Sequence, residues 1–250
     1  MIGNLCALTD NPLVFDAPVK AVVFDAVGTL IYPQPGVAAA YQAAIEKHFG
    51  VQIDKEVVSA AVRSALTSRS AGDELTTSES QEREFWSDLV KQLCPAGKAF
   101  NACFEELFAH FGDAANWRVF DDTATTIRGL QQLGLPVAIA SNFDDRLNAV
   151  CDGLPEVASI PHRIVSSLVG YRKPATPFFE AVAKVLNLSP AKILMVGDDP
   201  TNDVNGARAA GLQAVLIDRS RSANEPGVIT RLDQLVAQLD TTAVSGRDDG

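Results

Sequence analysis

Cysteine is scarce in this 250-residue sequence, and the few cysteines that occur are scattered. They are Cys6, Cys94, Cys103 and Cys151. No two of them form a Cys-x-x-Cys pair and no histidine is interleaved with them, so the sequence indicates neither a zinc site nor a thioredoxin-like redox motif. Buried or half-buried thiols are the simpler interpretation.

An excess of positive charge and a long hydrophobic run are also lacking. Lys and Arg number 21 against 31 Asp and Glu, for a net charge of −10, which disfavours a broad surface for nucleic acid or anionic membrane. No window approaches the ~18 consecutive apolar residues of a membrane span, and residues 1–18 show no early basic region followed by an apolar core. We therefore expect a cytoplasmic protein without nucleic-acid or membrane partners. Its assembly state is left open between monomer and homodimer.

The composition suits a single globular core with one sizeable insertion. Hydrophobic residues make up 47% and charged residues 21% of the sequence, which excludes a chain that is disordered throughout. A helical pattern interrupts an alternation of strands and helices, and Pro33 with Pro35 marks where it starts. The expected parts are an N-terminal arm over 1–18, an α/β core over 19–32 and 118–240, a helical insertion over 33–117, and a mobile tail over 241–250.

Four amphipathic helices are predicted within the insertion. Apolar residues recur at the 3.6-residue spacing of one helical face from Val37 onward, and Val57 is expected in the apolar stripe of the second helix. Asp54 is placed to cap that helix, and Ser78 with Gln81 resembles a capping box that opens the third. The aromatic residues of the third and fourth stripes also recur at helical spacing. They are therefore expected in a core rather than in a ligand site.

The rest of the sequence alternates strands with helices. Strands are predicted over the apolar runs 22–24, 136–140, 163–165, 192–196 and 213–217. Pro174 is well placed for the first turn of the helix that follows it, and a last helix is expected over 229–239. Such alternation implies right-handed crossovers and a parallel sheet buried on both faces. The predicted fold class is α/β, with a Rossmann-like doubly wound parallel sheet as the core.

Polar residues follow several of these strands at the point where each ends. Asp25, Ser141 and Asp198 each close an apolar run, and Lys173 stands in the stretch Gly-Tyr-Arg-Lys-Pro at 170–174. A lone Asp after a strand is usually a solvated turn residue, and a lone Lys is usually a surface cation. Open α/β sheets, however, place their chemistry at the carboxyl ends of their strands. The recurrence of these four groups therefore favours an active site.

The same residues carry a resemblance to a known family. Residues 24–30 read Phe-Asp-Ala-Val-Gly-Thr-Leu and residues 196–203 read Val-Gly-Asp-Asp-Pro-Thr-Asn-Asp, with Ser141 and Lys173 between them in order. This set resembles the four motifs of the haloacid dehalogenase-like hydrolase superfamily, over residues 19 to about 220. Ser-Asn-Phe-Asp-Asp-Arg-Leu at 141–147 is similar to the subgroup related to the rhythmically expressed gene product of insects. The helical insertion then looks like the family's α-helical cap.

The resemblance implies a role for each motif residue. The implied Mg²⁺ ligands are Asp25, the carbonyl of Val27, Asp198 and, as a further candidate, Asp203. The implied catalytic residues are Asp25 as nucleophile, Ser141 and Lys173, and the implied substrate-binding residues are Gly28, Thr29, Ser141, Asn142 and Lys173. Mg²⁺ prefers oxygen ligands and removes the repulsion between a carboxylate and a phosphate. The implied substrate is a small phosphorylated molecule.

Val27 departs from the family pattern, which has a second aspartate at this position. In phosphatases of the family that Asp protonates the leaving alcohol and then activates water, a contribution of about 10²–10⁴ in rate. Three interpretations follow. The chain is a Mg²⁺-dependent phosphatase that is slow on ordinary esters, a phospholigand-binding or interaction protein without turnover, or a haloacid dehalogenase that needs no metal.

Overall fold

A six-stranded parallel sheet forms the centre of the molecule in the computed structural model, which describes residues 13–71, 75–221 and 227–245. In spatial order its strands are β5 (His162–Val165), β4 (Val137–Ser141), β1 (Ala21–Phe24), β6 (Ile193–Gly197), β7 (Gln213–Ile217) and β8 (Val228–Ile229). Every neighbouring pair is parallel, and β1 lies between β4 and β6. The predicted α/β class with a doubly wound parallel sheet is confirmed, and β8 is an additional strand.

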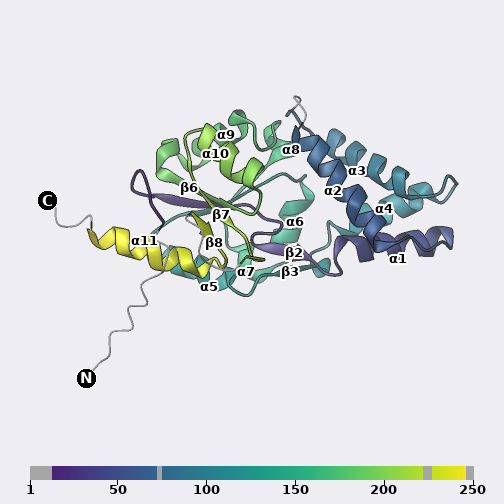
Figure 1. The fold of residues 1–250 in the computed structure, drawn as a ribbon, viewed down its shortest axis with the longest axis horizontal. Coiled ribbons are helices and arrows are strands. Elements are labelled where there is room, and N and C mark those ends of the chain that lie inside the picture. Colours follow the sequence, from purple (N-terminus) through teal and green to yellow (C-terminus); the bar gives the residue numbers. More distant parts are fainter. Residues whose placement is uncertain (1–12, 72–74, 222–226, 246–250) are drawn as a thin grey trace, which may run out of the picture.

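Helices cover both faces of this sheet, as Figure 1 shows. One face carries α5 (Thr123–Gln132), α6 (Arg146–Asp152), α7 (Pro155–Ala158) and α11 (Asp233–Ser245). The other carries α8 (Ser166–Val169), α9 (Thr176–Leu186) and α10 (Gly206–Ala209). Strand β1 shows why the run is apolar throughout: Val22 and Phe24 pack into the first core and Val23 into the second.

Four helices make a separate bundle to the right of the sheet in Figure 1. They are α1 (Val37–Phe49), α2 (Lys55–Ala71), α3 (Glu79–Leu93) and α4 (Phe100–His110), and they enclose a hydrophobic core of their own. The predicted caps are present, since the Gln81 N–H donates to Ser78 Oγ at 3.3 Å and the Glu56 N–H donates to Asp54 Oδ1 at 2.8 Å. We call these four helices the cap helices.

Short elements connect the cap helices to the sheet. The chain leaves the sheet through β2 (Ile31–Pro33) and returns through the 3₁₀ turn η1 (Ala114–Asn116) and β3 (Trp117–Val119). Strands β2 and β3 pair antiparallel, so the two crossings lie side by side. Two further short turns flank β6: η2 (Pro190–Lys192) and the π-helical η3 (Pro200–Asn205).

Several local predictions are wrong. Val57 is 52% exposed because its face of α2 points away from the other cap helices. Pro174 lies in the loop beside Lys173, and Pro177 is the proline in the first turn of α9. The last helix starts at Asp233, because residues 228–229 pair with β7, and it continues to Ser245 into the segment predicted as a mobile tail.

The predicted N-terminal arm lies partly outside the described residues, which begin at Leu13. Leu13 and Phe15 pack against the first core, and the Asp16 N–H donates to Gln213 Oε1 at 2.9 Å. Among the helices in the described parts of the chain, none combines the length and apolar character needed to cross a membrane.

Candidate active site

The groups that end three neighbouring parallel strands meet at one edge of the sheet. Asp25 follows β1, Ser141 ends β4 and Asp198 follows β6, and β1 lies between the other two strands. Ser141 Oγ donates to Asp25 Oδ1 at 3.0 Å. Asp25 and Ser141 are 6% and 2% exposed, so the apolar strands hold this polar pair below the surface.

Lys173 completes the buried charge arrangement. Its Nζ donates to Asp25 Oδ1 and to Asp203 Oδ1, each at 2.6 Å, and to the Ala140 carbonyl at 2.9 Å. Burial alone lowers the pKa of an ammonium group, but the carboxylates of Asp203 and Asp25 raise the pKa of Lys173 above its ordinary value. Lys173 is therefore a fixed positive charge shared by two carboxylates.

Asn142 fixes the backbone of Lys173 through a reciprocal pair of hydrogen bonds. The Lys173 N–H donates to Asn142 Oδ1 at 2.7 Å, and Asn142 Nδ2 donates to the Lys173 carbonyl at 3.0 Å. Both polar atoms of the Asn142 side-chain amide thus have partners within the protein. Its side chain borders the same cavity as Lys173, and the visible role of its amide is to position the lysine.

Asp25, Asp198 and Asp203 form a cluster in which one carboxylate oxygen from each lies within 4.8 Å of the others. Burial, together with the charge of Asp25 and despite Lys173, raises the pKa of Asp203 to about 6. Asp198 is exposed toward the cavity, yet desolvation by the surrounding protein and the charges of Asp25 and Asp203 raise its pKa to about 7. Three carboxylates face one lysine, so the cluster is short of positive charge.

The donor set of this cluster fits a hard divalent cation. Mg²⁺ takes oxygen ligands and binds through few carboxylates. Burial and then the neighbouring carboxylate charges raise the pKa values of Asp198 and Asp203, and a bound cation would offset both effects. Asp25, Asp198 and Asp203 are therefore the described residues that could hold Mg²⁺, and the carbonyl of Val27 stays a prediction.

A tight turn after β1 brings its backbone against Asp198. The N–H groups of Leu30 and Ile31 both donate to the Ala26 carbonyl at 2.9 Å, which folds the chain back on itself. Gly28 has φ +91°, and a Cβ there would lie 2.3 Å from Asp198 Oδ2. A glycine is required for both reasons.

The predicted phosphate-binding role of Gly28 and Thr29 stays a prediction, and the structure shows other contacts for both residues. The Gly28 N–H donates to the Ile31 carbonyl at 2.8 Å, so the turn itself uses this donor. Thr29 is fully buried, with its hydroxyl 3.4 Å from Asp198 Oδ1. Neither residue lines the adjacent cavity. In this structure both contribute by fitting closely around Asp198.

Asp199 and Asp203 have separate tasks in the segment after β6. Asp199 caps η3, with Oδ1 accepting the N–H groups of Thr201 and Asn202 at 2.8 and 2.9 Å. Asp203 Oδ2 accepts the Asp199 N–H at 3.1 Å while its Oδ1 binds Lys173. A Cβ on Gly197 would lie 2.1 Å from Asp203 Oδ2, so the absence of a side chain there lets Asp203 approach the strand.

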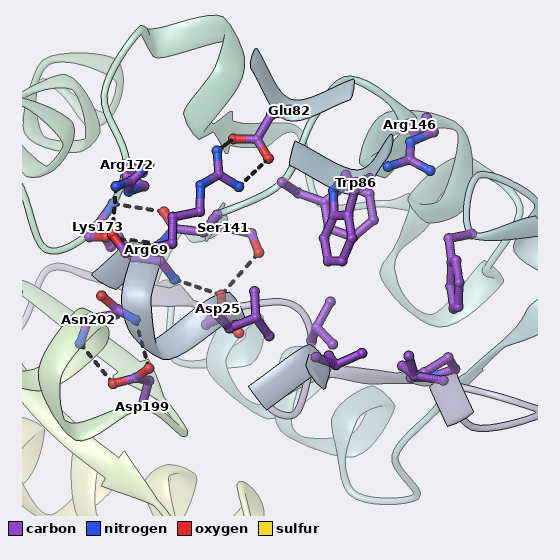
Figure 2. A pocket seen from close by; sticks show the side chains of 18 of the residues that line it. Asp25, Arg69, Glu82, Trp86, Ser141, Arg146, Arg172, Lys173, Asp199 and Asn202 are labelled. Carbon is purple, nitrogen blue, oxygen red and sulfur yellow. Dashed lines mark hydrogen bonds and ion pairs between the residues drawn. The ribbon is translucent and has the colours of Figure 1, made fainter. Parts of the chain in front are cut away.

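A cavity of about 590 Å³ extends from these residues toward the cap helices. Figure 2 shows Asp25, Ser141 and Lys173 joined at one end, with Trp86 and Arg146 at the other. Val27 is half-buried and lines the same space. The chemistry-bearing groups thus open into a cavity that is partly open to solvent rather than onto a flat surface.

Comparison with protein families identifies this arrangement. The family model of the haloacid dehalogenase-like hydrolases matches residues 19–211, which include every residue of the carboxylate cluster. The chain belongs to the haloacid dehalogenase-like hydrolase family. The family resemblance seen in the sequence is thereby confirmed.

Individual relatives of this haloacid dehalogenase-like hydrolase are distant. A bovine haloacid dehalogenase-like hydrolase domain-containing protein 3 is 26% identical over 210 residues, covering 79% of this chain and 81% of that protein. A phosphoserine phosphatase from Thermus thermophilus is 29% identical over 134 residues, covering 52% and 53%. The magnesium-bound hydrolase YfnB of Bacillus subtilis shares the fold with a TM-score of 0.70 and 18% identity, over 90% of this chain and all of that one.

Contacts between the cap helices and the sheet domain of this hydrolase were not foreseen from the sequence. The Arg172 N–H donates to the Leu75 carbonyl at 2.9 Å and the Thr77 N–H donates to the Gly170 carbonyl at 3.0 Å. Glu79 Oε1 accepts the Asp145 N–H at 2.9 Å. These bonds hold residues 75–79 against two loops, the one between β4 and α6 and the one that follows α8.

Two buried ion pairs at the cavity wall were also missed. Glu82 is 3% exposed and accepts from both terminal nitrogens of Arg69, with Nη1 at 2.7 Å. Arg146 donates to both oxygens of the buried Asp144 at 2.7 Å and to the carbonyl of Phe108 on α4 at 2.6 Å. The sequence signal for Arg146 was its place in the 141–147 motif, whereas the Arg69 pair depends on how two cap helices pack.

Proposed function

We propose that this chain is a Mg²⁺-dependent phosphatase that acts on a small phosphorylated molecule. Asp25 is the nucleophile, and the phosphoryl group is carried transiently on its carboxylate. One observation carries the proposal: Asp25 Oδ1 accepts hydrogen bonds from Ser141 Oγ at 3.0 Å and from Lys173 Nζ at 2.6 Å, and the carboxylates of Asp198 and Asp203 lie beside it. The kinship with a phosphoserine phosphatase supports the same reaction class.

Each residue has a physical task in this reaction. Lys173 is positioned beside the nucleophile, where it offsets phosphoryl charge, because burial keeps its ammonium group fixed and desolvated. Ser141 offers a hydroxyl donor at the same end of the cavity. Mg²⁺, held by Asp25, Asp198 and Asp203, would supply the charge neutralisation that lets an anionic carboxylate approach an anionic phosphate.

The test is phosphate release from acetyl phosphate and p-nitrophenyl phosphate, with Mg²⁺ and with a chelator. Release should require Mg²⁺ and fall at least about 10³-fold in Asp25→Asn, which removes the attacking oxygen. Asp88→Asn is the matched control, because Asp88 is exposed on α3 and does not line the cavity. Its release rate should equal that of the parent protein.

A binding function without turnover is favoured by one observation, the apolar Val27 at the cavity. It would appear as Mg²⁺-dependent binding of a phosphate analogue such as vanadate, with no phosphate release from any substrate. A dehalogenase would release halide from a 2-haloacid equally well with the chelator present. Either result would overturn the phosphatase proposal.

A further inference from the structure

The cavity wall contributed by the cap helices is apolar and largely aromatic. Tyr41, Leu66, Trp86, Phe104 and Phe108 come to it from all four helices. From outside the cap helices, Trp117 and Phe143 add two more rings, 6.0 Å apart between their centroids. Beyond the phosphate end the walls are thus mostly carbon, and about 590 Å³ lies in the range that holds organic ligands of moderate size.

The arginines that line the cavity are Arg69, Arg146 and Arg172, and each has partners within the protein, since Arg172 Nη2 donates to the Arg69 carbonyl at 2.6 Å. Arg69 is bound by Glu82, and Arg146 is bound by Asp144 and lies over the Phe108 ring at 3.5 Å from its centroid. A second anionic group on a substrate would have to displace a buried carboxylate from its arginine. Removing one partner from a buried ion pair is strongly unfavourable. The arginines of this cavity are therefore poor partners for a second phosphate or carboxylate on a substrate.

At the other end of the cavity, Val27 independently restricts which leaving groups a substrate can have. A valine side chain carries no proton to give to a leaving oxygen, so departure as the anion must be intrinsically easy. Phenols leave as anions far more readily than alkyl alcohols, and their rings match the aromatic walls. Both ends of the cavity point to the same class of molecule.

We propose, on the basis of the function proposed above, that the substrate is an aryl phosphate monoester whose aromatic group is uncharged and fills the cavity beneath the cap helices. An Asp25 oxygen attacks phosphorus, and the P–O bond to the aryl oxygen breaks. The bonding electrons leave on the aryl oxide, which takes a proton from solvent. Water then releases phosphate from Asp25, so the net reaction consumes one water and yields a phenol and inorganic phosphate.

The experiment compares kcat/KM for four substrates with the full chain and Mg²⁺: acetyl, phenyl, 2-naphthyl and 4-carboxyphenyl phosphate. Naphthyl phosphate should exceed phenyl phosphate by about tenfold, the effect of burying a second ring at roughly 25 cal/mol per Å². Carboxyphenyl phosphate should fall about tenfold below phenyl phosphate, although its leaving group is no worse. That loss would reflect the paired charges on the wall.

A matched pair of variants locates the effect. Leu66 lines the cavity from α2 and is 43% exposed, whereas Val57 on the same helix is 52% exposed and does not line the cavity. Leu66→Gln should lower the ratio of naphthyl to acetyl phosphate kcat/KM by about three- to tenfold. Val57→Gln should leave that ratio unchanged. Both sites are partly open to solvent, so both variants should fold.

The outcomes separate this inference from the proposed function. If acetyl phosphate is hydrolysed but naphthyl phosphate has no advantage over phenyl phosphate, the aryl assignment is overturned and the phosphatase stands. The same holds if carboxyphenyl phosphate is the best substrate or if Leu66→Gln and Val57→Gln behave alike. If none of the four phosphates is hydrolysed, the phosphatase itself is refuted.

Discussion

Replacing Val27 by Asp tests directly whether the apolar side chain at the cavity limits the reaction. The variant supplies a proton carrier beside Asp25, at the position where the family's phosphatase pattern has an aspartate. General acid–base catalysis by a positioned group is worth about 10²–10⁴ in rate, or roughly 3–5 kcal/mol of barrier. Turnover of an alkyl phosphate such as glycerol 3-phosphate should rise by that range.

The structure also sets what the substitution does to stability. Val27 is half-buried and packs against the first core, so its loss removes about 1 kcal/mol of apolar burial. The new carboxylate joins the cluster of Asp25, Asp198 and Asp203, where burial and then repulsion already raise the pKa values of Asp198 and Asp203. Mg²⁺ at about 100 times its Kd should raise the free energy of unfolding by about 2.7 kcal/mol, because it binds the folded state.

The assay is steady-state kcat/KM, which reports the attack on phosphorus, for glycerol 3-phosphate and p-nitrophenyl phosphate, with Val27→Asn as the control. The asparagine variant makes the same change in shape and polarity but cannot transfer a proton. The gain should be larger for glycerol phosphate than for the nitrophenyl ester, whose leaving group needs little protonation. A folded, Mg²⁺-binding Val27→Asp without any gain on alkyl phosphates, or an equal gain in Val27→Asn, would refute the reasoning.

Three further outcomes follow from the same geometry. Asp198→Asn should weaken Mg²⁺ binding more than about tenfold by calorimetry, since even an outer-shell partner contributes that much, and unchanged affinity would remove Asp198 from the ligand set. Gly28→Ala should lower the free energy of unfolding, measured by urea titration, by at least about 1–2 kcal/mol. The reasons are the φ of +91° at this residue and the distance of 2.3 Å between the new Cβ and Asp198 Oδ2. An unchanged free energy of unfolding would contradict the close fit of this turn against Asp198. In the presence of a chelator, the free energy of unfolding should fall as pH rises through 6–7, because the raised pKa values of Asp203 and Asp198 make the folded state hold protons that the unfolded state has lost. Mg²⁺ should reverse the fall at pH 8. A urea midpoint that does not change between pH 5 and 8 would count against this prediction.

The convergence of the motif residues could be predicted because it follows from sheet geometry. Asp25, Ser141 and Asp198 lie far apart in sequence, but each follows an apolar strand, and parallel strands share one carboxyl edge. Lys173 does not directly follow a strand of the sheet, so its position in the site was predicted only from the family pattern. The helices of the insertion were predictable for a similar reason, since their apolar periodicity and their caps at Asp54 and Ser78 are local signals.

The cavity wall could not be predicted, because it depends on how the cap helices sit on the sheet. The pattern that places Trp86 on an apolar stripe is the same whether that stripe faces the bundle core or a ligand. The Arg69–Glu82 pair joins residues 13 apart on different helices, which periodicity does not bring together. Strand β8 was missed because two residues, Val228 and Ile229, carry too little pattern to distinguish a strand from a helix start.

The valine at position 27 has opposite effects on the two halves of the proposed reaction. A fourth carboxylate there would add repulsion to a site where three already face one lysine, so valine favours entry of a phosphate dianion. Transfer to Asp25 then succeeds when the leaving group departs unaided, but the water that must release the phosphoryl group has lost its base. With an aryl phosphate, therefore, the second half should be slower than the first. Rapid mixing should show a burst of phenol equal to the enzyme concentration, and intact mass should show one phosphoryl group on the parent protein and none on Asp25→Asn. A linear release of phenol without a burst would mean that attack by Asp25, rather than loss of phosphate, is the slow step.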